Sequence, residues 1–171
     1  RHGVVVLYDC HSIRSRIPFL FQGVLPDLNI GDHGGASCAS AVTDAVHRSG
    51  GRIVAQLWHM GRLVHPDLGG GQPVSSSPTL APDFAHTYEG KKPYVRARAA
   101  TRGDIARIVG DYARAAANAV RAGFDGVQVH GANGYLLDQF LRTSANLRDD
   151  EYGCCVGNRL RPNQVAEQCL R

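Results

Sequence analysis

The sequence predicts an α/β fold in which strands and helices alternate along the chain. A strand-like run at 52–58 follows a helical stretch that ends at Gly50-Gly51. A second strand-like run at 124–130 follows the clearest helix of the sequence. Strands separated by helices are typical of a parallel sheet or barrel, in which functional groups gather at the carboxyl ends of the strands.

Length and composition limit the class of protein. The chain has 171 residues, of which 43% are hydrophobic and 20% charged, as in ordinary globular domains. This length suits one domain and is shorter than the ~250 residues of a complete eightfold β/α barrel. No apolar run approaches the ~20 residues that a membrane helix needs, so we expect no membrane partner. The first residues do not have the order of features of a signal peptide.

The charges and the cysteines exclude several kinds of site. Lys and Arg number 19 and Asp and Glu 15, a net charge of +4, but the arginines are scattered with few aromatic residues between them. We therefore expect no nucleic-acid surface. The 5 cysteines include the adjacent pair Cys154-Cys155 and no CxxC spacing, so we expect neither a disulfide scaffold nor a metal site. A reducing, cytoplasmic location follows from this pattern.

Glycines and the spacing of apolar residues indicate where the first predicted helix, strand and loop begin and end. Residues 41–47 have the pattern of the last turns of a helix, which Gly50-Gly51 end. After the strand at 52–58, residues 59–100 are predicted to form a loop, because glycines and prolines interrupt them repeatedly. A loop of this length is more often functional than idle.

The clearest helix begins near Asp104, which can cap its first turn or add charge to it, and ends at Gly123. Residues 135–141 start another helix after a Gly-rich turn, and residues 3–8 resemble a buried strand. Apolar residues recur at helical spacing on one face of the long helix, which we expect to be buried: Ile105, Ile108, Val109, Tyr112, Ala116, Ala119 and Val120.

Polar side chains that can carry chemistry follow the second strand. His130 and Asn133 flank a Gly-rich turn, where both can donate a hydrogen bond to one oxygen atom. Tyr135 adds a phenol that can deliver a proton to a carbon atom. Two donors beside a proton donor favour reduction or isomerisation next to a carbonyl or nitro group.

Other interpretations of single residues are structural. Taken alone, His130 is better explained as a structural histidine and Trp58 as part of the core. His59 and His65 are interpreted as residues of the loop surface. Arg142 and Arg148 are expected to form structural ion pairs, and Lys91-Lys92 is expected on a solvated loop.

Two segments resemble the Old Yellow Enzyme family, the FMN-dependent ene-reductases. Residues 56–62, with the sequence QLWHMGR, are similar to the third-strand motif of that family. Residues 122–142, which include AGFDGV and HGANGYLLDQFLR, closely resemble its fourth-strand signature. The resemblance extends over about residues 41–161 and is far more specific than a single glycine motif.

The resemblance implies part of a (β/α)8 TIM barrel, roughly its third and fourth β/α units. It implies FMN as cofactor, NADPH or NADH as reductant, and an enone, enal or nitro compound whose activated C=C bond is reduced. His130 and Asn133 would bind the substrate oxygen, and Tyr135 would protonate the α-carbon. Gln56, with His130, would contact the flavin, and Trp58 would shape the substrate pocket.

Both ends depart from the family pattern. Residues 1–40 match the first two barrel strands poorly, and residues 162–171 lose the pattern before the last strands, which in the family contact the flavin and its phosphate. Residues 153–159, GCCVGNR, stand where the family has Gly-Gly-Ser-x-Glu-Asn-Arg. We therefore expect a single incomplete barrel domain over 1–171, with both ends altered by rearrangement or frameshift.

Three functions remain open from the sequence. The first is an active ene-reductase, completed by another chain or as a homo-oligomer. The second is an inactive remnant of the family that cannot hold FMN, and the third is a small α/β module with a ligand or metal site at the histidine-bearing loop. Open strand edges in half a barrel predict marginal stability or self-association.

Overall fold

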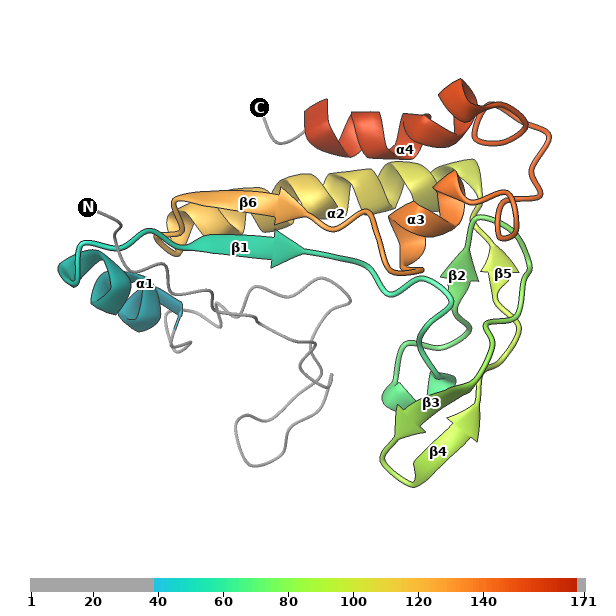
Figure 1. Cartoon of the computed structure of the whole chain (residues 1–171), viewed down its shortest axis with the longest axis horizontal. Coiled ribbons are helices and arrows are strands. Elements are labelled where there is room, and N and C mark those ends of the chain that lie inside the picture. Colours follow the sequence, from blue (N-terminus) through green and yellow to red (C-terminus); the bar gives the residue numbers. More distant parts are fainter. Residues whose placement is uncertain (1–38, 169–171) are drawn as a thin grey trace.

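Two parallel strands lie side by side in the structure, a computed structural model that describes residues 39–168 (Figure 1). Strand β1 (Val54–Leu57) pairs with β6 (Gly126–Val129), and the helix α2 (Arg102–Arg121) lies between them in the chain. The alternation of strands and helices confirms the α/β class. The strand expected at 3–8 lies outside the described residues.

Helix α1 (Ala39–Arg48) ends where Gly50-Gly51 predicted. The Thr43 hydroxyl donates a hydrogen bond to the Ala122 carbonyl at 2.8 Å and anchors α1 to the end of α2. Gly123 has a φ of 89°, and a Cβ there would lie 2.7 Å from the Thr43 oxygen. A glycine is required at this position, because both the left-handed backbone and the close approach exclude a side chain.

Asp125 connects α1 with the beginning of β1. Its carboxylate accepts hydrogen bonds from the Ile53 backbone N–H at 2.8 Å and from the Arg52 guanidinium at 2.6 Å. The His47 ring lies 2.9 Å from the same carboxylate. These contacts, the Ile53 N–H first among them, hold the pKa of Asp125 well below its usual range.

Helix α2 begins with a reciprocal cap between Thr101 and Asp104. The Thr101 hydroxyl accepts from the Asp104 N–H at 3.0 Å, and the Asp104 carboxylate accepts from the Thr101 N–H at 2.9 Å. Thr101 is thus the N-cap, and Asp104 occupies the third helical position rather than the cap. The Arg98 guanidinium, 2.6 Å away, is the main cause that lowers the pKa of Asp104.

The core forms where α2 packs on one face of the two strands. Leu57 on β1 is buried in it, with Val127 and Val129 of β6 packed against it. Val120 is 64% exposed, so its expected burial is wrong. It follows the fully buried Ala119 by about 100° around the helix, which turns it away from the strands. The buried residues of α2 are Ile105, Ile108, Tyr112, Ala115, Ala116 and Ala119.

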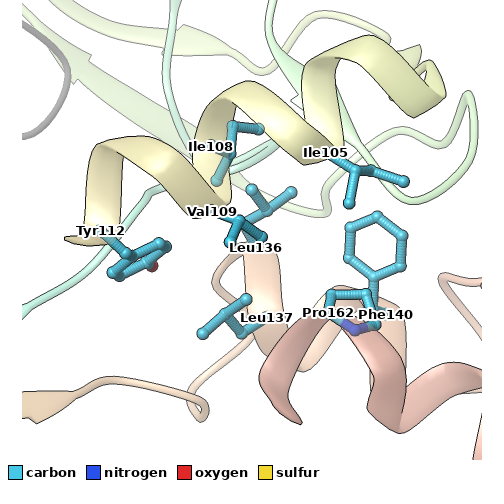
Figure 2. Close-up of a pocket in the computed structure, with 8 residues that line it drawn as sticks. All are labelled: Ile105, Ile108, Val109, Tyr112, Leu136, Leu137, Phe140 and Pro162. Carbon is cyan, nitrogen blue, oxygen red and sulfur yellow. The ribbon is translucent and has the colours of Figure 1, made fainter. Parts of the chain in front are cut away.

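Two further helices complete the packing around α2. Helix α3 (Leu136–Leu141) adds Leu136, Leu137 and Phe140 to the core that α2 forms with the strands. Helix α4 (Val156–Gln168) packs on both α2 and α3, and Figure 2 shows Pro162 of α4 beside Phe140 of α3 at an apolar pocket. Residues 162–171, which lose the family pattern, still continue this helix as far as Gln168. Helix α4 has no clear apolar face and contains a proline, so its sequence carries no helical signal, and packing stabilises it.

The segment predicted as a loop contains short strands. β2 (Val74–Ser75) pairs in parallel with β5 (Arg98–Ala99), and β3 (Phe84–Thr87) pairs with β4 (Gly90–Pro93) in an antiparallel hairpin. A one-turn helix, η1 (Pro66–Leu68), precedes them. The turn between β3 and β4 lacks the Asn-Gly signal that identifies a hairpin in a sequence.

His65 is 8% exposed, so its interpretation as a surface residue is wrong. Its ring nitrogen accepts a hydrogen bond from the Asp67 N–H at 3.2 Å and caps η1. His59 is half-buried, and its Nδ1 accepts from the Gly61 N–H at 3.0 Å. Both rings therefore have structural contacts within the loop.

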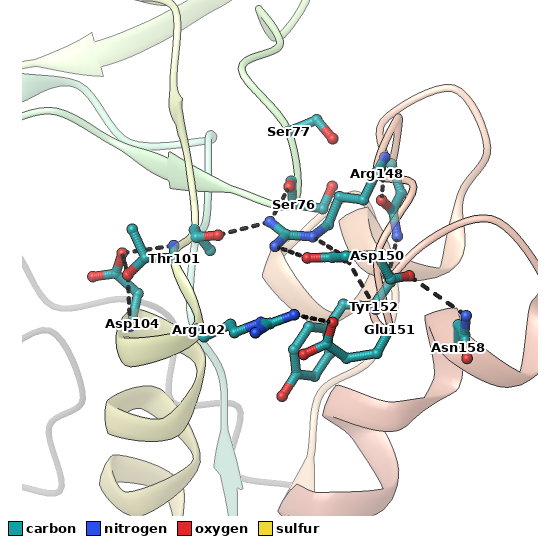
Figure 3. Close-up of polar contacts among 12 residues, drawn as sticks. Ser76, Ser77, Thr101, Arg102, Asp104, Arg148, Asp150, Glu151, Tyr152 and Asn158 are labelled. Atoms are coloured by element: carbon teal, nitrogen blue, oxygen red, sulfur yellow. Dashed lines mark hydrogen bonds and ion pairs between the residues drawn. The ribbon is translucent and has the colours of Figure 1, made fainter.

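The expected ion pairs are confirmed, and Arg148 forms the more extensive one (Figure 3). Its guanidinium donates to the Ser76 and Ala100 carbonyls at 3.1 and 2.7 Å and pairs with Asp150 at 2.5 Å. Arg142 pairs with Asp138 at 2.6 Å. The Arg148 contacts attach the segment after α3 to the chain around β2 and β5.

Among residues 39–168, none of the helices has both the length and the apolar character needed to cross a membrane. In the same part of the chain, no three His, Cys, Asp or Glu side chains gather closely enough to hold a metal ion.

Removal of the cap should destabilise α2. Thr101→Ala is expected to lower the free energy of unfolding by about 1 kcal/mol, because the Asp104 N–H loses its acceptor. Thr101→Ser keeps the hydroxyl and serves as the matched control. Urea unfolding followed by circular dichroism measures both variants, and equal stabilities for them would contradict this assignment.

The Asp125 contacts predict a pH-dependent contribution to stability. A carboxylate with a lowered pKa stabilises the fold above its unfolded-state pKa of about 3.9, and this contribution is lost as the pH falls through the folded-state value. We expect Asp125→Asn to unfold at lower urea than wild type at neutral pH, with a difference that shrinks in acid. A difference that does not change with pH would contradict the prediction.

Candidate functional site

The carboxyl ends of β1 and β6 lie side by side because the strands are parallel and in register. Leu57, the last residue of β1, stands opposite Val129, the last residue of β6. The His130 N–H donates to the Leu57 carbonyl at 2.8 Å and extends the pairing by one bond. Trp58 and His130 therefore leave the sheet at the same edge, as the sequence predicted for a parallel fold.

Three aromatic rings meet at this edge, which we call the ring cluster: Trp58, His130 and Tyr135. The Trp58 and Tyr135 rings lie edge to face with centroids 4.4 Å apart. The His130 centroid is 6.2 Å from that of Trp58 and 5.2 Å from that of Tyr135. All three residues are half-buried, so the cluster is packed and still reaches the surface.

The His130 Nε2 atom is buried and has no hydrogen-bond partner among the described residues. A buried polar atom without a partner costs about 1–3 kcal/mol. An oxygen or nitrogen atom of a bound small molecule could supply the missing bond. This nitrogen is therefore the chemical group of the cluster that best fits a ligand.

Asn133 lies in the turn between His130 and Tyr135. Its backbone is in the left-handed region with a φ of 57°, and Gly134 follows with a φ of 80°. Asparagine tolerates this conformation better than most residues. Asn133 is exposed at this turn and borders the ring cluster. The cluster itself brings together three of the predicted side chains, Trp58, His130 and Tyr135.

Gln56 lies on the face of β1 that points away from α2. Its neighbours Ala55 and Leu57 are buried, whereas Gln56 is exposed. Its amide donates to the Gln128 side chain of β6 at 2.7 Å, directly across the strand pair. Gln56 thus occupies the polar face of the sheet rather than the ring cluster itself.

Tyr94 belongs to the electrostatic surroundings of the ring cluster, although the sequence did not single it out. Burial raises the pKa of the Tyr94 phenol, and the nearby charges of Tyr135 and Asp83 add to the shift. It follows β4 directly, within the segment predicted as a loop. Only the fold brings this residue toward Tyr135.

The sequence also did not single out two polar residues of α3, Asp138 and Gln139. Asp138 accepts from the Gly134 N–H at 2.7 Å and is 7% exposed, and the side chain of Gln139 is completely buried. Two buried polar residues in one short, otherwise apolar helix are a signal that the sequence could have provided, since such residues need specific partners.

Comparison with known proteins gives related sequences over most of the chain. The family model of the NADH:flavin oxidoreductase / NADH oxidase family matches residues 26–164. 12-oxophytodienoate reductase 1 of Oryza sativa subsp. japonica is 44% identical over 123 residues, 70% of this chain and 31% of that protein. 12-oxophytodienoate reductase 7 of the same plant is 45% identical over 130 residues, again 70% of this chain and 32% of that protein. The chain spans about a third of the length of these relatives.

Solved structures that resemble this chain come from related oxidoreductases. The Old Yellow Enzyme homologue from Zymomonas mobilis has a TM-score of 0.75 and 52% identity, over 77% of this chain and 37% of that one. Morphinone reductase in complex with tetrahydroNAD has a TM-score of 0.76 and 39% identity, over 82% of this chain and 41% of that one. The chain belongs to the NADH:flavin oxidoreductase / NADH oxidase family, in agreement with the resemblance to Old Yellow Enzyme.

Proposed function

We propose that this chain carries the substrate-facing part of an FMN-dependent oxidoreductase that reduces activated C=C bonds with NADPH or NADH. The observation that carries the proposal is the buried His130 Nε2 inside the ring cluster, which has no hydrogen-bond partner within residues 39–168. Membership of the family and the likeness to morphinone reductase with tetrahydroNAD support a flavin and a nicotinamide reductant.

The strand pair suits one wall of a flavin site. We propose that β1 and β6 are the third and fourth strands of a (β/α)8 barrel, with α2 on the outside. The Gln56 and Gln128 amides lie on the sheet face opposite the core, which such a barrel would enclose. Amides donate and accept hydrogen bonds, as the polar edge of a flavin ring requires.

The chain's own residues would then bind and polarise the substrate. When FMN is bound and reduced, it supplies the hydride for the β-carbon of the alkene. His130 Nε2 and the Asn133 amide donate hydrogen bonds to the substrate's carbonyl or nitro oxygen and draw electron density toward it. The Tyr135 hydroxyl gives its proton to the α-carbon. Trp58, packed edge to face on Tyr135, holds that ring in place.

Flavin binding tests the cofactor assignment. The purified chain is expected to bind FMN, and Gln56→Leu is expected to weaken binding because an amide on the flavin-facing strand is lost. Gln72→Leu removes an exposed amide that contacts the Arg96 carbonyl and serves as the control. Flavin fluorescence titration measures the dissociation constants. A wild-type chain that binds no FMN would contradict the proposal and favour the inactive alternative.

Proton donation is tested at Tyr135. Tyr135→Phe keeps the ring that packs on Trp58 but removes the hydroxyl, so turnover of cyclohexenone by the FMN-loaded chain should fall by about 100-fold. Flavin reduction by NADPH or NADH should continue. Tyr88→Phe, on the exposed turn of the hairpin, is the control. An unchanged enone turnover in Tyr135→Phe would refute this role.

A further inference from the structure

Gln139 lies where the segments that follow β1 and β6 meet. We infer that Gln139 is a positioning residue: its side-chain amide fixes the segment that carries Trp58 relative to the turn that carries His130 and Tyr135. The inference extends the proposed function, because the ring cluster is the site on which that function rests.

One amide connects both segments. Its Nε2 donates to the Gly134 carbonyl at 2.6 Å and to the Met60 carbonyl at 3.4 Å. Its Oε1 accepts from the Arg62 N–H at 3.2 Å. Met60 comes two positions after Trp58, and Gly134 directly precedes Tyr135, so these bonds reach the backbone beside two of the three rings.

The chemistry of the contact requires an amide. The side chain must offer two N–H donors to carbonyls and one oxygen to an N–H, and only a carboxamide has both. Glutamate has the same shape but would place a second acceptor against two carbonyls. Methionine has a similar length but would leave the Arg62 N–H and the Gly134 carbonyl without their Gln139 partner. The Met60 carbonyl would keep its bond from the Leu63 N–H at 3.1 Å.

The approach of the two segments is close enough to exclude a side chain at Gly61. A Cβ there would overlap the Gln139 amide, and Gly61 also has a φ of 61°. The loop therefore lies directly on the Gln139 amide. This contact buries the amide completely and leaves room only for a glycine at position 61. This fit leaves the loop little freedom to move while the amide is in place.

Backbone and carboxylate bonds attach α3 to the same two segments but do not replace the amide. The Leu136 N–H donates to the His59 carbonyl at 2.9 Å, and Asp138 accepts from the Gly134 N–H at 2.7 Å. The first bond reaches only the segment after β1, and the second only the turn after β6. Among the described residues' side chains, Gln139 alone has hydrogen bonds to both Met60 and Gly134.

The chain contains a built-in reporter for this role. Trp58 is the single tryptophan of the sequence and packs in the ring cluster, so its fluorescence reports the cluster without bound FMN. The test variants are Gln139→Met and Gln139→Glu. The matched controls are Asn146→Leu and Asn146→Asp, because Asn146 is a buried amide that bonds the Phe140 and Tyr152 carbonyls, outside both segments.

We expect both Gln139 variants to keep the far-UV circular dichroism of wild type, while Trp58 emission shifts to the red and acrylamide quenching rises. The Asn146 variants should keep the wild-type emission even where they lower stability. In the FMN-loaded chain, cyclohexenone turnover should fall by about 100-fold in the Gln139 variants, as expected when reacting groups are misplaced.

Two results would overturn the inference. One is unchanged Trp58 emission and quenching in folded Gln139 variants. The other is loss of the whole fold in both Gln139 variants while the Asn146 variants stay folded, which would make Gln139 a general structural residue. A wild-type chain that binds no FMN would instead refute the proposed function, while the fluorescence result would still decide the role of Gln139.

Discussion

The parallel pairing of β1 with β6 is the constraint on which the candidate site depends. Because the strands run in one direction and in register, Leu57 and Val129 end together, and Trp58 and His130 emerge at one edge. Helix α2 packs on one face of the pair, so alternate residues of β1 enter the core and Gln56 stays on the opposite face. The alternation that builds the core also supplies a polar surface for a ligand.

Polar groups around the ring cluster fall into two kinds. The buried amide of Gln139 and the carboxylate of Asp138 have their partners within the chain. The buried Nε2 of His130 has none among residues 39–168. Because an unmet buried bond is costly, the first kind stabilises the geometry of the cluster, whereas the second favours the entry of a ligand. Rigidity and reactivity therefore belong to different residues of the same site.

Elements with a strong local signal could be predicted, and others could not. The predicted ends of α2 lie close to the observed ones, because its apolar face, its polar first turn and Gly123 all indicate the same helix. The hairpin β3–β4 was missed because its turn has no distinctive sequence, and α4 because it contains Pro162 and lacks an apolar face. The burial of His65 was missed because a capping contact in a loop has no period that a sequence could show.

The sequence by itself determined the α/β class, the family, and the five candidate residues, because regular periods, glycine turns and an ordered motif are local properties of the chain. These candidates are Gln56, Trp58, His130, Asn133 and Tyr135. Only the tertiary structure decided that the rings of Trp58, His130 and Tyr135 meet and that Gln139 joins the two segments. It also decided that His130 Nε2 has no partner in the part of the chain that the structure describes. The bond from Arg62 to Gln139 links residues 77 positions apart, and such contacts depend on how α3 packs on the loops rather than on any local pattern.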